Sequence, residues 1–320
     1  LAGLVLFGQG SKSLGTIVAI SSYASYFWQP IMNLGNIFNN FINNIAYLER
    51  IFETMDEPVT VKDAENAVKM PEIRGEVTFD HVNFSYDESK QILKDVSFTV
   101  KPGESVALVG PTGAGKSTIV NLISRFYNVN GGRVLIDGQD ISQVTIHSLR
   151  EQMGIMMQDS FIFSGDIEDN IRYGKLDATL EEIVNASKTV CADEFISKMP
   201  DGYQTEVRER GSMLSQGQKQ LISFARTLLS DPAILILDEA TSSIDVQTEK
   251  ALQTGLNAML KGRTSFIIAH RLSTIRNCDK IMYIDNGGIM ESGTHDELMT
   301  KKGYYYKLYT AQLDEVQKAG

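Results

Sequence analysis

The feature that most constrains this chain is a glycine-rich run, GPTGAGKS, at residues 110–117. It follows a hydrophobic stretch, SVALV, that is expected to be a strand, and it precedes a stretch with a helical pattern. The glycines let the backbone turn tightly, so that successive N–H groups point inward at an anion. Lys116 adds a positive charge, and Ser117 offers a hydroxyl ligand for Mg²⁺. This pattern is the Walker A motif, and it predicts a nucleoside triphosphate site at the start of a helix.

A second apolar run, AILILDEAT at residues 233–241, places two carboxylates at the end of an expected buried strand. Asp238 can hold Mg²⁺ through water, and Glu239 can polarise the attacking water as a general base or orient it. Such a pair is also common at a loop start or a helix cap, so the Walker A motif upstream is what favours catalysis. From Gly75 onward, short β-rich runs alternate with helical patterns, which predicts an α/β fold with a parallel sheet and crossover helices.

The N-terminal segment has a different character, because no residue between Lys12 and Glu49 carries a charge at neutral pH. A helix over the 36 positions between them would be about 54 Å long, against about 30 Å for the hydrocarbon core of a membrane. The apolar part, residues 14–34, fits one membrane span. The asparagine-containing stretch that follows is predicted to continue into water as an amphipathic helix. A long buried helix of a soluble protein is the alternative.

These patterns divide the chain into three parts. Residues 1–57 are expected to form the end of a membrane domain, in which an apolar stub and a turn precede the final spanning helix. Residues 58–75 are polar, contain two prolines and are predicted to be a linker. Residues 76–320 are expected to form a nucleotide-binding domain. Because one span cannot form a pathway, the sequence is expected to be the C-terminal part of a larger membrane protein.

Charge and cysteine content argue against a nucleic-acid-binding protein and against a disulfide-rich one. The 40 acidic and 30 basic side chains give a formal net charge of −10. This balance disfavours a nucleic-acid partner, because nucleic acids bind basic surfaces. The two cysteines, Cys191 and Cys278, cannot form a disulfide framework and indicate a reducing, cytosolic environment for most of the chain.

The run LSQGQ at residues 214–218 completes the pattern, because its Ser215 lies 23 positions before Asp238. With the two runs above, it resembles the signature sequence of the ATP-binding cassette (ABC) transporters, specifically the exporter half-transporters. Ser215 as a plain helix N-cap is the simpler interpretation of this run alone. The resemblance implies an α/β P-loop NTPase with a RecA-like parallel-sheet core, an antiparallel β subdomain and a helical subdomain at about 159–231, preceded by a long transmembrane α-helix. It also implies ATP and Mg²⁺ as cofactors.

The resemblance assigns roles to individual residues. Ser215 would cap a helix from Gln216 to about Leu229, whose N–H groups face the γ-phosphate held by the opposite subunit. The implied catalytic residues are Gln158, Glu239 and His270, and the implied metal contacts are Ser117, Gln158 and Asp238. The implied nucleotide contacts are Tyr86, Gly110, Pro111, Thr112, Gly113, Ala114, Gly115, Lys116, Ser117, Thr118, Ser215, Gly217, Gln218 and Asp245.

Some of these residues also have simpler interpretations. Tyr86 resembles the aromatic residue on which adenine stacks, although an ordinary strand tyrosine would look the same. A lone histidine after a strand, such as His270, is more often structural, and the accompanying motifs favour a switch histidine that reaches the γ-phosphate. Asp245 resembles the aspartate that links the two sites of a dimer, and Glu209 resembles the exporter loop between the signature and the membrane domain.

Two positions depart from the family pattern, since Gln216 and Arg208 stand where glycine is usual. A side chain at position 216 is expected to weaken the nucleotide site that this helix completes, because it removes the freest backbone at a crowded contact. The Walker residues Lys116, Asp238 and Glu239 are intact. We therefore expect one half of a heterodimer, rather than of a homodimer, with one competent and one degenerate site. The implied activity is ATP-driven export of a drug or lipid across the cell membrane, with the nucleotide-binding domain in the cytoplasm.

Two other functions are compatible with parts of the pattern. A soluble ABC ATPase of DNA repair or chromosome maintenance would carry a long coiled coil between Gln158 and Ser215, which are only 57 positions apart. A regulatory cassette that binds ATP but scarcely hydrolyses it would usually lack Glu239.

Overall fold

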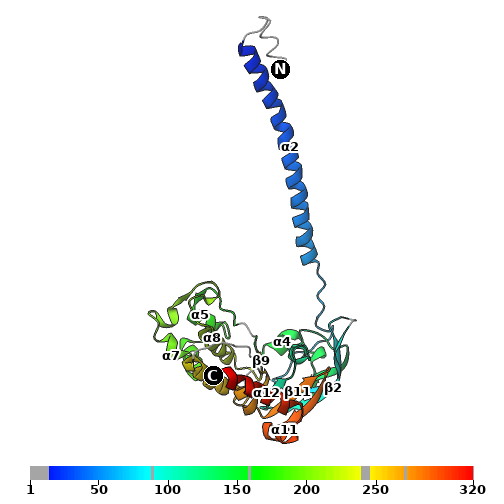
Figure 1. Ribbon diagram of the computed structural model, residues 1–320, viewed down its shortest axis with the longest axis vertical. Coiled ribbons are helices and arrows are strands. Elements are labelled where there is room, and N and C mark those ends of the chain that lie inside the picture. Colours follow the sequence, from blue (N-terminus) through cyan, green and yellow to red (C-terminus); the bar gives the residue numbers. More distant parts are fainter. Residues whose placement is uncertain (1–13, 88–89, 158–159, 239–245, 270–271, 320) are drawn as a thin grey trace. The chain divides into compact units, whose positions relative to one another are not determined.

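The computed structural model describes residues 14–87, 90–157, 160–238, 246–269 and 272–319 (Figure 1). The chain divides into two compact units between Thr60 and Val61. In the described part of the chain, the first unit holds one long helix and the second unit holds all the strands.

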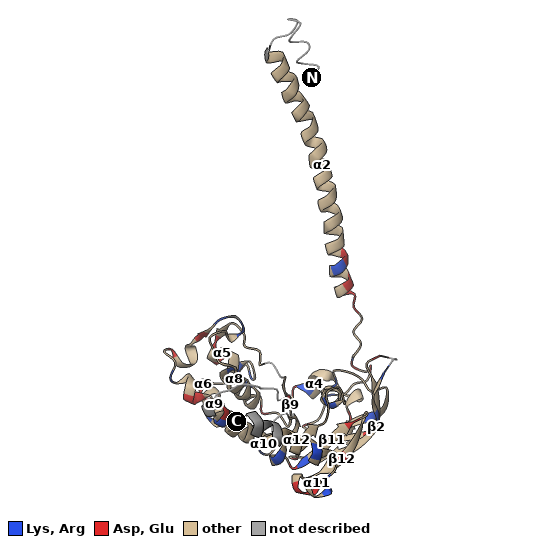
Figure 2. Ribbon diagram, viewed as in Figure 1, with Lys and Arg blue, Asp and Glu red and all other residues tan. Residues whose placement is uncertain are grey.

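The long helix of the first unit, α2 (Leu14–Met55), has 42 residues and contains Pro30. Its charged side chains gather in its last turns, as Figure 2 shows. The predicted long N-terminal helix is therefore confirmed. The span expected at residues 14–34 falls within α2, and none of the helices in the described ranges reaches the combination of length and hydropathy that defines a candidate span. Serine, tyrosine, glutamine and asparagine residues lie among the aliphatic ones of α2 and lower its mean hydropathy.

Two larger sheets and one small one form the second unit. The described strands are β1 (Val77–Ser85), β2 (Gln91–Val100), β3 (Ser105–Val109), β4 (Gly131–Ile136), β5 (Gln139–Asp140), β6 (Met153–Met156), β7 (Gly165–Asp166), β8 (Glu206–Val207), β9 (Ile234–Asp238), β10 (Thr264–Ile268), β11 (Lys280–Asp285) and β12 (Gly288–Gly293). The central sheet has the order β12-β11-β3-β10-β9-β6. Strands β6, β9, β10, β3 and β11 run parallel, and β12 pairs with β11 in the antiparallel direction. The predicted parallel sheet is confirmed, with one antiparallel edge strand.

The second sheet has the order β2-β1-β4-β5 and is antiparallel throughout. Its inner face is apolar, and Phe79 of β1 stacks on Phe98 of β2 with ring centroids 4.5 Å apart. This sheet corresponds to the antiparallel β subdomain that the resemblance implies.

Helices cover the sheets and form a group of their own. The helices of the second unit are α3 (Lys116–Ile123), α4 (Ile146–Arg150), α5 (Ile167–Arg172), α6 (Leu180–Thr189), α7 (Asp193–Ile196), α8 (Gln216–Leu229), α9 (Val246–Leu260), α10 (Leu272–Asn277), α11 (His295–Lys301) and α12 (Tyr304–Ala319), with the 3₁₀ turns η1 (Ile141–Gln143), η2 (Gly202–Gln204) and η3 (Glu209–Gly211). Helices α5, α6 and α9 contact α8. Figure 1 shows α5, α7 and α8 grouped together within this unit.

The central sheet is buried on both faces. Within β3, Ala107 and Val109 belong to an apolar cluster shared with α5, α6 and α8. Val106 and Leu108 belong to a second cluster, shared with the antiparallel sheet and α3. Alternate residues of a strand point to opposite faces, so a strand covered on both sides needs an unbroken apolar run. Burial on both faces therefore explains the unbroken aliphatic runs in the central strands.

The segment 58–75, predicted as a linker, belongs to the second unit from Val61 onward. Met70 and Ile73 are only 3% and 5% exposed. Val68 forms an isolated parallel bridge with Val144. Most of this segment is therefore attached to the second unit.

Candidate functional site

The loop between β3 and α3 requires glycine at both of its ends. Gly110 has φ +138° and Gly115 has φ +109°. A Cβ atom at Gly110 would lie 2.1 Å from the carbonyl oxygen of Ile284, and one at Gly115 would lie 2.9 Å from Cδ2 of Leu93. These two glycines therefore allow both the positive φ angles and the close approach of neighbouring chain. A loop folded in this way directs backbone N–H groups toward a bound anion.

Lys116 is the first residue of α3 and folds back over the loop. Its ammonium group donates hydrogen bonds to the carbonyl oxygens of Gly110 (2.8 Å) and Pro111 (2.9 Å). Burial lowers the pKa of this ammonium group, while the carboxylate of Asp238 acts in the opposite direction. A desolvated cation of this kind is stabilised when a phosphate comes close.

The N-terminus of α3 offers N–H groups to a ligand. Its N-cap is Gly115, which has no side chain to accept a hydrogen bond from the first turn. The first N–H groups of any helix lack acceptors inside the helix, and the helix dipole favours an anion there. Ser117 is exposed, whereas Thr118 is buried. The hydroxyl group of Ser117 is thus the one that is accessible to a metal ion at the phosphates.

Tyr86 lies directly beside this loop. Its hydroxyl oxygen is 3.1 Å from Oγ1 of Thr118. The ring packs edge-to-face against Phe84 and Tyr127, with centroids 4.8 and 4.9 Å apart, and Tyr86 remains 49% exposed. The structure therefore brings an exposed aromatic surface next to the phosphate loop. Stacking of adenine on that surface stays a prediction.

The carboxyl ends of four neighbouring parallel strands meet at one edge of the central sheet. Leu108 of β3 is in register with Ile268 of β10, and Ile268 is in register with Asp238 of β9. On the other side of β9, Leu237 is in register with Met156 of β6. Open α/β sheets bind their ligands at this edge. The structure thus brings Asp238 and the glycine-rich loop to the same edge.

Three predicted catalytic residues follow these strand ends in the sequence. Gln158 comes two positions after β6, Glu239 one position after β9, and His270 two positions after β10. Together with Asp245, they lie outside the described residues. Their connection to the strand ends supports the prediction, and their side-chain roles stay predictions.

The helix α8 begins with a reciprocal cap. Oγ of Ser215 accepts a hydrogen bond from the backbone N–H of Gln218 (3.2 Å), and Oε1 of Gln218 accepts one from the N–H of Ser215 (2.9 Å). The predicted helix from Gln216 to Leu229 is confirmed. Gly217 is buried, whereas Gln216 is exposed to solvent. The side chain at 216 is therefore not packed inside this chain.

Arg226 of α8 is a functional candidate that the sequence reasoning missed. Its guanidinium group donates to the carbonyl oxygens of Asn170 (2.7 Å) and Phe161 (3.0 Å), and it lies over the rings of Phe163 and Tyr173. Burial lowers its pKa. Arg226 thus fixes the segment after Gln158 to the helix that Ser215 heads.

A signal for Arg226 was present in the sequence. The positions four residues before it and three residues after it, Ile222 and Leu229, are apolar and belong to the buried face of α8. A charged residue on the apolar face of a helix is uncommon unless it is paired.

The comparisons with known proteins agree with this geometry. The family model described as "ABC transporter" matches residues 93–242. A putative multidrug export ATP-binding/permease protein of Bacillus subtilis is 50% identical over 95% of this chain and 52% of its own length. A fatty acid ABC transporter ATP-binding/permease protein of Mycobacterium bovis is 44% identical over 97% of this chain and 49% of its own length.

A solved structure of a bacterial Atm1-family ABC exporter with ATP bound is also similar, with a TM-score of 0.77 and 41% identity over 96% of this chain and 54% of that chain. The chain belongs to the ABC transporter family. It carries the family's ATPase fold and spans about half the length of the curated relatives that it matches.

The predicted site residues of the ABC family lie on two separate elements of this structure. The structure places Tyr86, Lys116 and Asp238 around one strand edge, with residues 110–115 between β3 and α3 and residues 116–118 in the first turn of α3. The signature residues Ser215, Gly217 and Gln218 head a different element, α8. Among the described residues, none of the hydrogen bonds made by these three reaches the loop.

The donor set at the loop suits Mg²⁺. Ser117 offers a hydroxyl oxygen and Asp238 a carboxylate oxygen at the same edge of the sheet. In the described ranges, no group of three or more His, Cys, Asp and Glu side chains is placed to hold a metal ion. Magnesium in nucleotide sites usually takes only one or two protein ligands and completes its shell with water and phosphate oxygens. The residues present therefore fit Mg²⁺ better than a metal held by a protein cage.

The two departures from the ABC pattern differ in their structural setting. Arg208 has φ −71° and an extended backbone that any residue adopts, so glycine is not required there. Gln216 is the first residue of α8, in the centre of the signature. Of the two positions, only 216 lies within the signature run itself. Glu209 is the first residue of η3, and its predicted role in the exporter loop stays a prediction.

Proposed function

We propose that this chain binds and hydrolyses Mg·ATP at residues 110–118, and that the full-length protein uses this reaction to export a hydrophobic or amphipathic compound across the cell membrane. The meeting of four parallel strand ends at the phosphate loop is the observation that carries the proposal. The nucleotide-binding unit would lie in the cytoplasm. The names of the two relatives, a multidrug exporter and a fatty acid transporter, favour a drug or a lipid as cargo.

Binding follows from the loop and the first turn of α3. The ammonium group of Lys116 and the N–H groups of the loop hold the β- and γ-phosphates. Ser117 and Asp238 hold Mg²⁺, which neutralises charge on the phosphates when it is bound. The exposed ring of Tyr86 receives adenine, which explains why an aromatic residue beside the loop remains half exposed.

Hydrolysis requires a group that activates water beside the γ-phosphate. Glu239 takes that role as general base, because it follows Asp238 at the end of β9. His270, after β10, contacts the γ-phosphate. Gln158, after β6, contacts Mg²⁺ and water.

Transport requires a second cassette. The N-terminus of α8, headed by Ser215, docks on the γ-phosphate held by the partner, so that each nucleotide lies between two chains. ATP drives closure because it binds the closed pair better than the open one. Gln216 favours a heterodimer, in which a partner with a normal signature completes the site formed by Lys116 and Glu239. Two relatives are named as ATP-binding/permease proteins, which argues against a soluble ATPase of DNA repair.

The proposal is tested by comparing ATP hydrolysis and nucleotide binding in two variants. Glu239→Gln keeps the shape of the side chain and removes the base, so hydrolysis should fall about 100-fold or more while Mg·ATP still binds. Lys116→Ala should abolish binding itself. Equal hydrolysis rates in the wild type and Glu239→Gln would contradict the hydrolytic mechanism and favour a regulatory cassette.

The heterodimer is tested separately, by expressing this half-transporter alone. Low ATP turnover that rises when a partner with a normal signature is supplied would support it. Full ATP turnover and transport by a homodimer would rule it out.

A further inference from the structure

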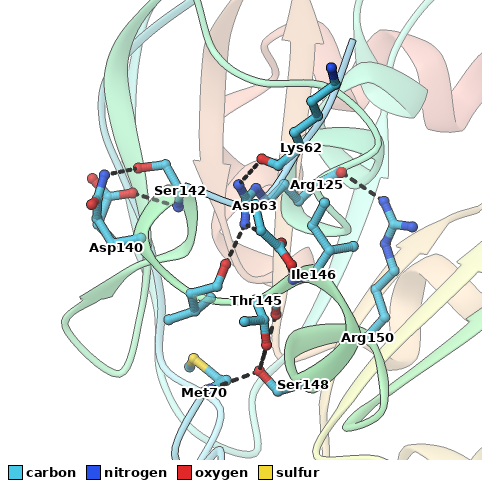
Figure 3. Close-up of polar contacts among 12 residues, drawn as sticks. Lys62, Asp63, Met70, Arg125, Asp140, Ser142, Thr145, Ile146, Ser148 and Arg150 are labelled. Atoms are coloured by element: carbon cyan, nitrogen blue, oxygen red, sulfur yellow. Dashed lines mark hydrogen bonds and ion pairs between the residues drawn. The ribbon is translucent and has the colours of Figure 1, made fainter. Parts of the chain in front are cut away.

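Residues 61–76, called the strap here, run from the first unit onto the end of α3. Figure 3 shows Lys62 and Asp63 of the strap beside Arg125, which lies two positions after α3. Arg125 is only 2% exposed. Its Nη2 donates to the carbonyl oxygen of Lys62 (3.0 Å), and its Nη1 lies 3.9 Å from Oδ1 of Asp63. A buried guanidinium group thus ties the strap to the helix that begins at the phosphate loop.

A second arginine, Arg150, also binds the C-terminal end of α3. Arg150 donates to the carbonyl oxygens of Ser124 (3.0 Å) and Arg125 (2.8 Å), and Arg125 itself donates to the carbonyl oxygen of Val144 (2.5 Å). These carbonyl groups include those at the C-terminal end of α3, where cations are favoured by the helix dipole. The end of α3 is therefore fixed by two arginines, one of which also holds the strap.

The strap is also bound to the segment that follows. Oδ1 of Asp63 accepts a hydrogen bond from the N–H of Ile146 (2.8 Å), the first residue of α4. The N-cap of α4, Thr145, makes no side-chain cap of its own, so the strap supplies it. Val68 donates to the carbonyl oxygen of Gln143 (3.1 Å) and accepts from the N–H of Thr145 (2.9 Å).

The remaining part of the strap is held through its backbone. The N–H of Met70 donates to Oγ of Ser148 (2.8 Å), and the N–H of Ile73 donates to Oε1 of Gln152 (2.8 Å). The carboxylate of Asp137 accepts from the N–H groups of three successive residues, Arg74, Gly75 and Glu76. The strap is therefore docked at several points between Lys62 and Glu76 rather than at one.

The docked strap is close along the chain both to α2 and, through α3, to the nucleotide loop. Helix α3 has eight residues, about 12 Å, between the phosphate loop and its end. Five residues, 56–60, separate the end of α2 at Met55 from the strap. One rigid element thus connects the nucleotide site to the strap, and a short piece of chain connects the strap to α2.

We propose that the strap couples the nucleotide site to α2, with Arg125 as a positioning residue that transmits displacement of α3 to the strap. Coupling is reciprocal, so a docked strap also raises the affinity of the loop for nucleotide. This inference rests on the proposed binding of Mg·ATP at residues 110–118. It adds that release of the strap weakens binding, although none of the hydrogen bonds described for the strap reaches the nucleotide loop.

The test uses the full chain, a non-hydrolysable ATP analogue with Mg²⁺, and amide hydrogen exchange. Val68→Pro removes the N–H group that donates to Gln143 and should release the middle of the strap. Its matched control is Val59→Pro, at another exposed valine, for which the described residues show no backbone hydrogen bond. We expect Val68→Pro to speed exchange at residues 62–70 and to weaken analogue binding about five-fold or more. Val59→Pro should change neither.

A second variant guards against a purely local effect of proline. Arg125→Lys keeps the charge but has one ammonium group, which cannot reach both carbonyl oxygens in the fixed geometry of the guanidinium fork. Like Val68→Pro, Arg125→Lys should speed amide exchange in the strap and weaken binding of the analogue. Faster strap exchange with analogue affinity within two-fold of the wild type, in either variant, would overturn the inference alone. A wild-type chain that fails to bind the analogue would overturn the proposed function as well.

Discussion

Gly110 shows most directly how a single residue shapes the site. Its φ is +138°, and a Cβ atom added to it would lie 2.1 Å from the carbonyl oxygen of Ile284. Gly110→Ala should lower the free energy of unfolding by about 3–4 kcal/mol, because the clash is with backbone and adds to the cost of the φ angle. Gly103→Ala is the control, since Gly103 also has a positive φ, +77°, and an added Cβ would meet nothing within 4 Å. It should cost about 1–2 kcal/mol.

Chemical denaturation of both variants measures this difference. Equal losses in Gly110→Ala and Gly103→Ala would show that the close approach to Ile284 contributes nothing, and that only the backbone angle matters.

The residues that could be predicted at the site are those whose chemistry is local. Lys116 and Asp238 lie next to a glycine-rich turn and an aliphatic strand, so the sequence around each one indicates its role. The partners of Arg125 and Arg226 could not be found in this way, although the position of Arg226 on the apolar face of α8 marks that residue itself. Each arginine donates to carbonyl oxygens far away in the sequence, 63 positions for Arg125 and Lys62 and 65 for Arg226 and Phe161. A carbonyl group exists at every residue, so no sequence pattern marks the acceptor.

Among the helices, α8 combines a structural cap with a proposed functional one. Ser215→Ala removes one half of the capping box and should cost about 1 kcal/mol of stability. It should also lower ATP hydrolysis by about ten-fold or more, because a hydrogen bond to a charged phosphate is worth about 1.5–3 kcal/mol. Thr294→Ala is the matched control, since Thr294 forms the same capping box at α11. It should show the stability loss without the loss of hydrolysis.

Thermal unfolding and ATPase rates of the two variants separate these effects. If Thr294→Ala reduces hydrolysis as much as Ser215→Ala does, the loss reflects general destabilisation and not the signature.

The cap of α6 predicts a pH dependence. The hydrogen bond from Lys175 (2.7 Å) and those from Thr179 lower the pKa of Glu182 from 4.5 to about 2. A carboxylate with a lowered pKa contributes stability that is present above pH 4.5 and is lost as the pH falls toward 2. The unfolding temperature of Glu182→Gln should therefore lie below that of the wild type at pH 7, and the gap should narrow between pH 5 and pH 2.

Glu181→Gln is the control for this pH dependence, because Glu181 is the exposed neighbour in the same first turn. Scanning calorimetry across the pH range measures both variants. A gap for Glu182→Gln that is unchanged down to pH 3 would contradict the assigned cause.

The elements themselves were predictable to different degrees. The parallel sheet follows from apolar runs that alternate with helical patterns, and α8 follows from its cap and its periodicity. Residues 58–75, which include most of the strap, were predicted to be a linker because their composition is polar and they contain two prolines. The strap is docked mainly through backbone N–H and carbonyl groups to Arg125, Gln152 and Asp137. Composition describes side chains and carries no information about such contacts.

At the scale of the whole molecule, the proposed function requires two chains to share each nucleotide. In the proposed dimer, the signature of each chain completes the site of its partner, so a chain expressed alone would carry Gln216 in both sites. The side chain of Gln216 is exposed in the chain itself, so its removal leaves the apolar core of the chain unchanged. A substitution at this position therefore tests the assembly without disturbing the fold.

Gln216→Gly should raise the ATPase rate of the chain expressed alone by about ten-fold, because it restores close backbone approach at both sites at once. Arg208→Gly is the control, since Arg208 is the other departure from the family pattern but has an ordinary φ of −71°. It should leave the rate unchanged. Steady-state ATPase assays of the two variants and the double variant measure this. An unchanged rate in Gln216→Gly would place the deficit elsewhere, whereas an equal rise in Arg208→Gly would remove the argument that position 216 is special. Because only an exposed residue at the head of α8 is altered, any gain arises from contact between chains, which is where the proposed pump assembles its catalytic site.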